Sequence, residues 1–276
     1  MLDRARKSAF PTRQAIALGL LQGPTELLPV SSSAHAALLP WFAGWGYSEL
    51  DPQLRKSFEV GLHAGAGIAL AIDMRSELLQ EALTMDARRA ATIACSLAPA
   101  AIAGYALRGV IERRLGGPRT IAAGLAAGAV AMALADAGGA RAGRALRDAG
   151  PVDGLALGLA QAVALIPGVS RSGAALTAAR ARGFARADAQ ALSWHAALPV
   201  LLGAGVLEGE RLARSGAPEG AAAALAAGAA AAFISTLASA RVLRGRARAL
   251  LPWSVYRGLL ALAVMRRLRR AHNRGR

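Results

Sequence analysis

Residues 22–35 read Gln22-Gly-Pro-Thr-Glu26-Leu-Leu-Pro-Val-Ser31-Ser32-Ser33-Ala-His35, and residues 161–173 read Gln161-Ala-Val-Ala-Leu-Ile-Pro-Gly-Val-Ser170-Arg171-Ser172-Gly173. Both polar segments lie inside apolar sequence, where an ionisable side chain within a bilayer costs roughly 3 kcal/mol or more. Such a cost usually marks function. The segments also correspond at a spacing of about 139 residues, because Gly19, Gln22, Val30, Ser31 and Ser33 recur as Gly158, Gln161, Val169, Ser170 and Ser172. The chain therefore reads as a duplicated membrane protein whose two polar segments form one site.

The composition also favours a membrane protein. Hydrophobic residues make up 54% of the chain, charged residues 18%, and the mean hydropathy is +0.36. Runs without any charged residue extend over residues 90–107, 120–135, 154–170 and 220–240. About 20 residues cross a bilayer core, so these runs predict membrane helices, some of them short, tilted or re-entrant.

The net charge of +16 could suggest a nucleic-acid partner, but its distribution argues against one. The arginines form short clusters between the apolar runs, for example at residues 88–89, 141–147 and 266–276. Positive-inside topology and anionic headgroups produce this pattern. We therefore expect the bilayer as partner and no nucleic acid. The basic end from Arg266 favours a cytoplasmic C-terminus, although other loops are also basic.

The apolar segments number about eight to ten, with centres near residues 20, 38, 66, 99, 128, 163, 198, 230 and 259, and no strand alternation competes with them. The most polar connection, residues 136–153, divides the chain nearly in half. We predict one integral membrane domain over residues 1–276, with a first repeat at about 10–136 and a second at about 153–266.

Each polar segment contains a proline, Pro29 or Pro167, which predicts a break in the helix. The serines that follow are good N-caps for the helices beginning after them, and a helix N-terminus is a ready anion site. Interrupted apolar segments at corresponding positions of two halves indicate a binding site near the membrane midplane. We therefore expect an all-α polytopic membrane protein with two inverted-topology repeats that contain broken or re-entrant helices.

Acidic and amide side chains suggest a metal site. Gln22 and Glu26 are four residues apart, on one face of a helix, and carboxylate and amide oxygens suit Mg²⁺ or Ca²⁺. Glu59, which opens another apolar run, is either a further metal ligand or a charge at headgroup level. His63 and His195 lack such neighbours in the sequence, which favours a place outside the site.

The remaining polar side chains suit phosphate chemistry. Arg171 offers a planar fork of donors that matches phosphate oxygens, with snorkelling to the headgroups as the alternative. The serine runs offer hydroxyl and backbone N–H donors, and one serine hydroxyl could act as a nucleophile beside a base such as His35. Phosphoryl transfer needs mainly positioning and charge stabilisation, so this inventory predicts action on a phosphate ester or anhydride.

Three motifs resemble those of the undecaprenyl-diphosphatase family, the bacitracin-resistance type of lipid pyrophosphate phosphatase. They are Gln22-x-x-x-Glu26, Leu28-Pro-Val-Ser-Ser-Ser-Ala-His35 and Pro167-Gly-Val-Ser-Arg-Ser-Gly173. Weaker similarities extend the resemblance over nearly the whole chain. The resemblance implies a multi-pass enzyme of the bacterial plasma membrane that removes one phosphate from undecaprenyl diphosphate and recycles the lipid carrier of cell-wall synthesis. It also implies divalent cation dependence and a site that opens toward the extracytoplasmic face.

The resemblance implies roles for individual residues. Gln22 and Glu26 handle the metal or the pyrophosphate, and Ser32 or His35 acts as nucleophile or base, a choice that the motif leaves open. Phosphate-binding groups are Ser31, Ser33, Ser170, Arg171 and Ser172.

This chain departs from the family pattern at three positions. Gln22 replaces a Glu found in many members, Ala34 replaces the usual Gly, and His63 stands where a Gln is common. No required chemical group is lost, but metal affinity and pH optimum are expected to differ.

A lipid-phosphate transporter or flippase is the competing interpretation, because duplicated broken helices are also a transporter design. Turnover in detergent, without sealed vesicles, separates it from the phosphatase. The sequence leaves open the preferred metal, the polyprenyl chain length and the oligomeric state, a homo-oligomer included.

Overall fold

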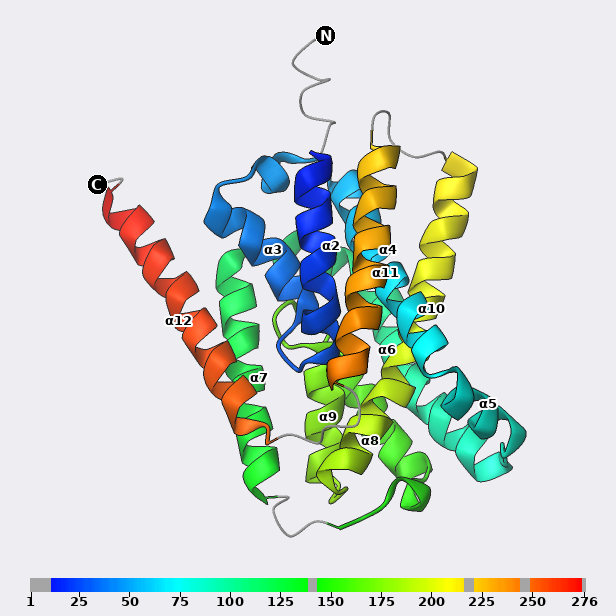
Figure 1. Ribbon diagram of the computed structural model, residues 1–276. Helices are drawn as coiled ribbons and strands as arrows, with labels where there is room; N and C mark the ends of the chain where they lie inside the picture. The colour runs from blue at the N-terminus through cyan, green and yellow to red at the C-terminus, as the bar shows by residue number, and fades with distance from the viewer. Residues whose placement is uncertain (1–10, 139–142, 216–220, 244–248, 275–276) are drawn as a thin grey trace. The chain divides into compact units, whose positions relative to one another are not determined.

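The structure, a computed structural model, describes residues 11–138, 143–215, 221–243 and 249–274, and these residues form helices with no β-strand (Figure 1). The predicted all-α class is confirmed. Parts of the basic clusters at residues 141–147 and 266–276 lie outside the described residues. The chain forms two compact units, each assembled from separate stretches of sequence.

The first unit comprises Met1–Leu27, His35–Thr84 and Leu198–Arg244. Its elements are α2 (Thr12–Leu27), most of α3 (Ser32–Ala43), the 3₁₀ turn η1 (Gly46–Glu49), α4 (Pro52–Asp73), α5 (Arg75–Leu83), the second part of α10 (Arg186–Ser215) and α11 (Ala222–Leu243). Helices α2 and α11 pack side by side (Figure 1). Gly19 permits this approach, because a Cβ there would collide with the carbonyl oxygen of Gly228.

The second unit comprises Leu28–Ala34, Met85–Ala197 and Gly245–Arg276. Its elements are α6 (Ala87–Arg114), α7 (Pro118–Gly138), the 3₁₀ turn η3 (Leu146–Asp148), α8 (Pro151–Val163), α9 (Arg171–Ala181), the first part of α10 and α12 (Leu251–Arg274). Helix α8 packs on α6, and α7 packs on α9 and α12. A Cβ at Gly158 would come within 2.5 Å of the Cys95 carbonyl oxygen, so a glycine again sets the helix separation.

Four of the described helices are long and apolar enough to cross a membrane. They are α6 over Ala87–Leu107, α7, α10 over Arg186–Arg211 and α11. The apolar segments predicted near residues 20, 38 and 163 form helices too short to cross alone, and those near 66 and 259 form helices with more polar side chains. Several apolar helices of this length are typical of a multi-pass membrane protein.

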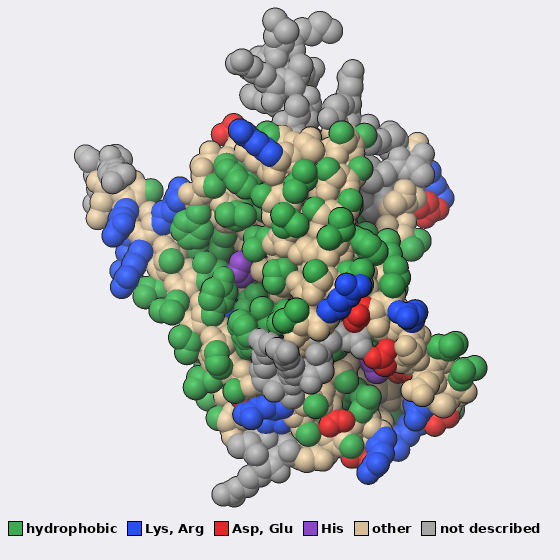
Figure 2. All heavy atoms as spheres, viewed as in Figure 1, with side chains coloured by type: hydrophobic (Ala, Val, Ile, Leu, Met, Phe, Trp, Pro, Cys, Tyr) green, Lys and Arg blue, Asp and Glu red, His purple; other side chains and the backbone are tan. Residues whose placement is uncertain are grey.

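Large aliphatic side chains face outward from these helices. In the first unit, Ile16, Leu20 and Ile234 are exposed, and Figure 2 shows hydrophobic side chains over the surface formed by α2 and α11. In the second unit, Ile102 and Leu134 are both more than two-thirds exposed. Such surfaces suit a hydrocarbon environment.

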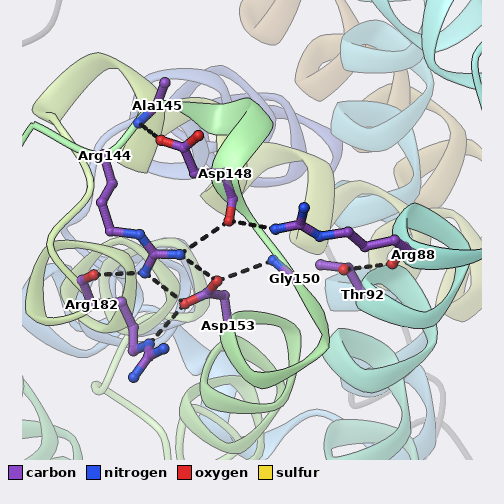
Figure 3. Close-up of polar contacts among 8 residues, drawn as sticks. All are labelled: Arg88, Thr92, Arg144, Ala145, Asp148, Gly150, Asp153 and Arg182. Carbon is purple, nitrogen blue, oxygen red and sulfur yellow. Dashed lines mark hydrogen bonds and ion pairs between the residues drawn. The ribbon is translucent and has the colours of Figure 1, made fainter.

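A network of charged side chains holds the start of α8, within the connection that the sequence predicts as the joint between repeats (Figure 3). The buried Asp153 carboxylate accepts hydrogen bonds from both Nη atoms of Arg144 at 2.9 and 2.8 Å, from Arg182 Nε at 2.8 Å and from the Gly150 N–H at 3.0 Å. The Arg144 guanidinium also lies 4.2 Å from the ring centre of Phe184. This part of the joint is therefore anchored.

Burial would raise the pKa of Asp153, but the bonds from Arg144, Arg182 and Gly150 hold it at about 2. The carboxylate is therefore ionised at neutral pH. Arg88 of α6 extends the network by donating to the Asp148 carbonyl oxygen at 3.0 Å. The boundaries of the two repeats stay a prediction.

Candidate functional site

Two short loops interrupt the helices at the predicted positions. We name residues 28–33 the first serine loop and residues 167–172 the second serine loop. Helix α2 ends at Leu27 and α3 begins at Ser32, while α8 ends at Val163 and α9 begins at Arg171. Proline in each segment, which lacks an N–H donor, agrees with these helix ends.

Both serine loops contain a serine with an unusual, positive φ. Ser31 has φ 75° and Ser170 has φ 73°, and no other described residue except glycine has a positive φ. A left-handed conformation of a residue with a side chain costs roughly 1–3 kcal/mol. Its occurrence at the two corresponding serines indicates that both loops are held in a defined, strained shape, as at many functional sites.

The side chains of these two serines cap the helices that follow. Ser170 Oγ accepts a hydrogen bond from the Gly173 N–H at 3.1 Å, and Ser31 Oγ accepts one from the Ala34 N–H at 3.4 Å. The predicted capping role is thereby confirmed for both residues. The hydroxyl oxygens of Ser31 and Ser33 lie 3.3 Å apart, and those of Ser170 and Ser172 lie 3.4 Å apart.

The second unit brings the two serine loops together through Arg257 of α12. This guanidinium donates to the Pro29 carbonyl oxygen at 3.3 Å, to that of Gly168 at 3.1 Å and to that of Val169 at 2.7 Å. Arg257 is fully buried. Sequence reasoning gave Arg257 no role; the available signal was a single arginine in an apolar stretch of the chain.

The predicted nucleophile, base and phosphate ligand occupy the first turns of the two helices. Ser32 is the first residue of α3 and is half-buried, and His35 lies one turn later on the same helix and is buried. Arg171 is the first residue of α9 and is half-buried. Residues at positions i and i+3 of a helix share a face, so Ser32 and His35 can act on a common group.

The acidic motif lies in the first unit, near the end of α2. Gln22 and Glu26 are buried, and Gln22 Nε2 donates to Glu26 Oε2 at 3.0 Å. The same nitrogen lies 2.8 Å from His63 Nδ1. An amide nitrogen only donates, so Nδ1 of a neutral His63 accepts. His63, which the sequence placed outside the site, therefore belongs to a chain from His63 through Gln22 to Glu26.

Glu59, the other acid considered as a metal ligand, is hydrogen-bonded to a tyrosine. Its Oε1 accepts a hydrogen bond from the Tyr47 hydroxyl at 3.2 Å. Burial and the nearby carboxylate raise the pKa of Tyr47 well above its ordinary value, so this hydroxyl stays protonated and donates. No group of three or more His, Cys, Asp or Glu side chains that could hold a metal occurs among the described residues.

One carboxylate and one amide are nevertheless a usable pair of oxygen donors. Mg²⁺ commonly binds through one or two carboxylates together with substrate phosphates and water. Glu26 can supply the carboxylate oxygen. Gln22 can bind the ion only through its side-chain carbonyl oxygen, because its amide nitrogen bonds to Glu26 and His63. The oxygen donors of Glu26 and Gln22 therefore fit a divalent cation.

Comparison with known proteins covers most of the chain. The family described as bacitracin resistance protein BacA matches residues 15–263. The undecaprenyl-diphosphatase of Geobacter sulfurreducens is 42% identical over 268 residues, which is 91% of this chain and 96% of that protein. Undecaprenyl-diphosphatases of Pelotomaculum thermopropionicum and Gemmatimonas aurantiaca are each 36% identical over 91% of this chain, and over 95% and 96% of their own lengths.

The matched range includes both serine loops, the acidic motif and Arg257. Identity at this level across nearly the full lengths of several proteins shows common descent. The chain belongs to the bacitracin resistance protein BacA family.

Proposed function

We propose that this chain is an undecaprenyl-diphosphatase, a membrane enzyme that hydrolyses undecaprenyl diphosphate to undecaprenyl phosphate and inorganic phosphate. The reaction recycles the lipid carrier of cell-wall synthesis. The observation that carries the proposal is the match to undecaprenyl-diphosphatases over 91% of the chain, in a protein with several apolar helices long enough to cross a membrane.

The serine loops suit the binding of a diphosphate. The N-termini of α3 and α9 begin in these loops, and the partial positive charge of a helix N-terminus favours phosphate oxygens. We assign phosphate binding to Arg171 and to the hydroxyl groups of Ser31, Ser33, Ser170 and Ser172. Arginine and helix N-termini neutralise the charge that accumulates on the transferred phosphoryl group.

The chemical step breaks the anhydride bond between the two phosphorus atoms. Ser32 attacks the terminal phosphorus while His35 removes its proton, or His35 itself attacks; the leaving group is undecaprenyl phosphate, and water then releases inorganic phosphate from the enzyme. Acid treatment of the trapped phosphoenzyme distinguishes the two routes, because a phosphoserine survives acid and a phosphohistidine does not.

We assign the handling of a divalent cation, Mg²⁺ or Ca²⁺, to Glu26 and Gln22. When bound, the cation would neutralise negative charge on the diphosphate. Glu26 supplies a carboxylate oxygen, and the Gln22 amide orients that carboxylate by hydrogen bonding to it. The hydrogen bond between Glu59 and Tyr47 favours a structural role for Glu59.

We also propose that residues of about 10–136 and 153–266 form two repeats of inverted topology. Each repeat contains a broken or re-entrant helix, interrupted at its serine loop. Two observations support this arrangement. The capping serines share a positive φ near 75°. The packing is also reciprocal: α2 of the first half packs on α11 of the second, while α8 of the second half packs on α6 of the first. Gly19 and Gly158, 139 residues apart, provide the close approach in the two pairs.

The proposed location is the bacterial plasma membrane, with the site open to the extracytoplasmic side and a polyprenyl diphosphate lipid as substrate. Purified protein in detergent should release phosphate from undecaprenyl diphosphate or a shorter polyprenyl diphosphate. Folded Arg171→Ala and Glu26→Ala variants should lose this activity. Unchanged hydrolysis by both variants would contradict the residue assignment.

The same assay separates the phosphatase from a lipid-phosphate flippase. A flippase moves its substrate between two faces of a sealed membrane and yields no new chemical product in detergent. If the wild type releases no phosphate in detergent but translocates the lipid in vesicles, the phosphatase proposal fails.

A further inference from the structure

We propose that Arg257 is a positioning residue for the phosphatase reaction. It holds both serine loops in their binding conformation through their backbone carbonyl groups. The inference rests on the proposed function, because it takes the loops to bind diphosphate. The structural basis is independent of the ligand, since one buried guanidinium bonds to carbonyl groups of both loops, at Pro29 and at Gly168 and Val169.

The guanidinium occupies a space that two glycines leave open. A Cβ at Gly128 of α7 would overlap Arg257 Nη2 and lie 2.8 Å from its Cζ. A Cβ at Gly173 of α9 would lie 2.8 Å from Arg257 Nη1. Glycine is therefore required on two different helices for the arginine to reach the loops. The space left by Gly128 and Gly173 therefore matches the planar guanidinium of Arg257.

The charge of Arg257 is balanced by dipoles alone among the described residues. None of their carboxylates pairs with it, and its three acceptors are neutral backbone carbonyl oxygens. A cation removed from water without a counter-ion is costly, and such arrangements in membrane proteins usually serve function. A diphosphate bound at the serine loops would supply the missing negative charge nearby.

The bonds to Arg257 explain how the strained serines persist. Val169 immediately precedes Ser170, and Pro29 precedes Ser31 by two residues. A positive φ in a residue with a side chain is stable only when the surroundings determine it. By binding carbonyl groups one or two residues before Ser31 and Ser170, Arg257 sets the direction in which each loop enters the capped helix.

The first test replaces Arg257 by lysine, which keeps the charge but loses the fork. A single ammonium cannot satisfy three carbonyl groups from two loops in the same geometry. We expect kcat/KM of folded Arg257→Lys to fall by about 100-fold, mainly through kcat, because a displacement of about 1 Å in catalytic groups has an effect of that size. Arg266→Lys, at an exposed position of the same helix, should keep the wild-type kcat and KM.

The second test keeps Arg257 but displaces its guanidinium. Gly128→Ala fills the space of Arg257 Nη2 and also places a Cβ 3.0 Å from the Val169 carbonyl oxygen that this guanidinium binds. It should lower kcat to a similar extent. Gly258→Ala is the matched control, because a Cβ at this neighbour of Arg257 meets no atom within 4 Å. Monodisperse elution and thermal unfolding midpoints of all variants report whether each is folded.

The double variant Gly128→Ala/Arg257→Lys decides between positioning and general destabilisation. If both changes act through the same guanidinium, the double variant should lose little more activity than either single variant. Activities of the single variants within twofold of wild type would overturn the inference. So would additive losses that follow the unfolding midpoints. Absence of phosphate release by the wild type would instead refute the proposed function, so the two failures are distinguishable.

Discussion

The two serine loops share a positive-φ capping serine but differ in their side chains. Both place a serine at φ near 75°, cap the next helix with its hydroxyl and bring a second serine hydroxyl within 3.4 Å. At the next position, however, the first loop has Ser32 and the second has Arg171. His35 corresponds to Ala174, and Glu26 corresponds to Leu165. The two loops therefore offer similar helix N-termini, and the residues that we propose as acid, base and nucleophile all lie at the first loop or just before it.

The glutamines that precede the loops show the same divergence. Gln22 donates to Glu26 and His63, whereas Gln161 donates to the Ser96 carbonyl oxygen at 3.0 Å and its buried Oε1 has no hydrogen-bond partner among the described residues. An isolated amide that bonds one helix to another is a structural contact. Equal sequence position thus does not imply equal function.

The largest loss of activity is expected when Arg171 of the second serine loop is replaced by serine, the residue at the corresponding position of the first loop. Arg171→Ser removes the fork that we assign to phosphate and should lower kcat/KM by roughly 10³-fold, as the loss of a strong charge-stabilising donor does in other enzymes. The measurement is the kcat/KM for phosphate release from a polyprenyl diphosphate. Arg266→Lys serves as the control, and near wild-type activity of Arg171→Ser would show that the second loop binds no phosphate.

Removal of the divalent cation should have the next largest effect. Excess chelator should lower phosphate release by the wild type by roughly 100-fold, because the diphosphate charge would then be neutralised by protein groups alone. Added Mg²⁺ or Ca²⁺ should restore activity. Glu26→Gln should start from a low rate and respond weakly to chelator; a full response would place the cation elsewhere.

The capping serines should show matched effects on stability. Ser31→Ala and Ser170→Ala each remove a cap and keep the Cβ at positive φ that serine already has, so loss of the cap should lower the free energy of unfolding by about 1–2 kcal/mol. Ser31→Gly and Ser170→Gly should cost less, because glycine tolerates that φ. Unfolding in detergent provides the comparison. If alanine and glycine are equivalent at one loop only, the two backbones are less alike than the structure indicates.

The smallest effects should separate the two glutamines. Gln22→Leu breaks the chain from His63 to Glu26 and should lower kcat by about 10-fold, the size expected for loss of one hydrogen bond to a charged group. Gln161→Leu loses one bond and also removes a buried unpaired acceptor, so stability should change by less than about 1 kcal/mol. Its kcat should be unchanged. A loss of activity in Gln161→Leu would reveal a second polar site.

The local features of the chain could be predicted from its sequence. Apolar runs predicted the helical class, Pro29 and Pro167 predicted the two breaks, and the serines after them predicted the caps at Ser31 and Ser170. Pro24, by contrast, lies inside α2. These predictions succeed because a missing N–H group, a restricted φ and a short hydroxyl side chain act within a few residues. The roles of Glu26, Ser32, His35 and Arg171 in the reaction stay predictions.

Long-range contacts could not be predicted in the same way. His63 was placed outside the site because no polar neighbour lies near it in sequence, yet it contacts Gln22, 41 residues away. Sequence reasoning assigned no role to Arg257, which reaches Pro29 across 228 residues and Val169 across 88. The helices, their two breaks and their caps follow from local sequence, because each depends on neighbouring residues. The side chain that fills the gap at Gly128 and Gly173 and joins the two loops is known only from the folded protein, because it depends on how distant helices pack.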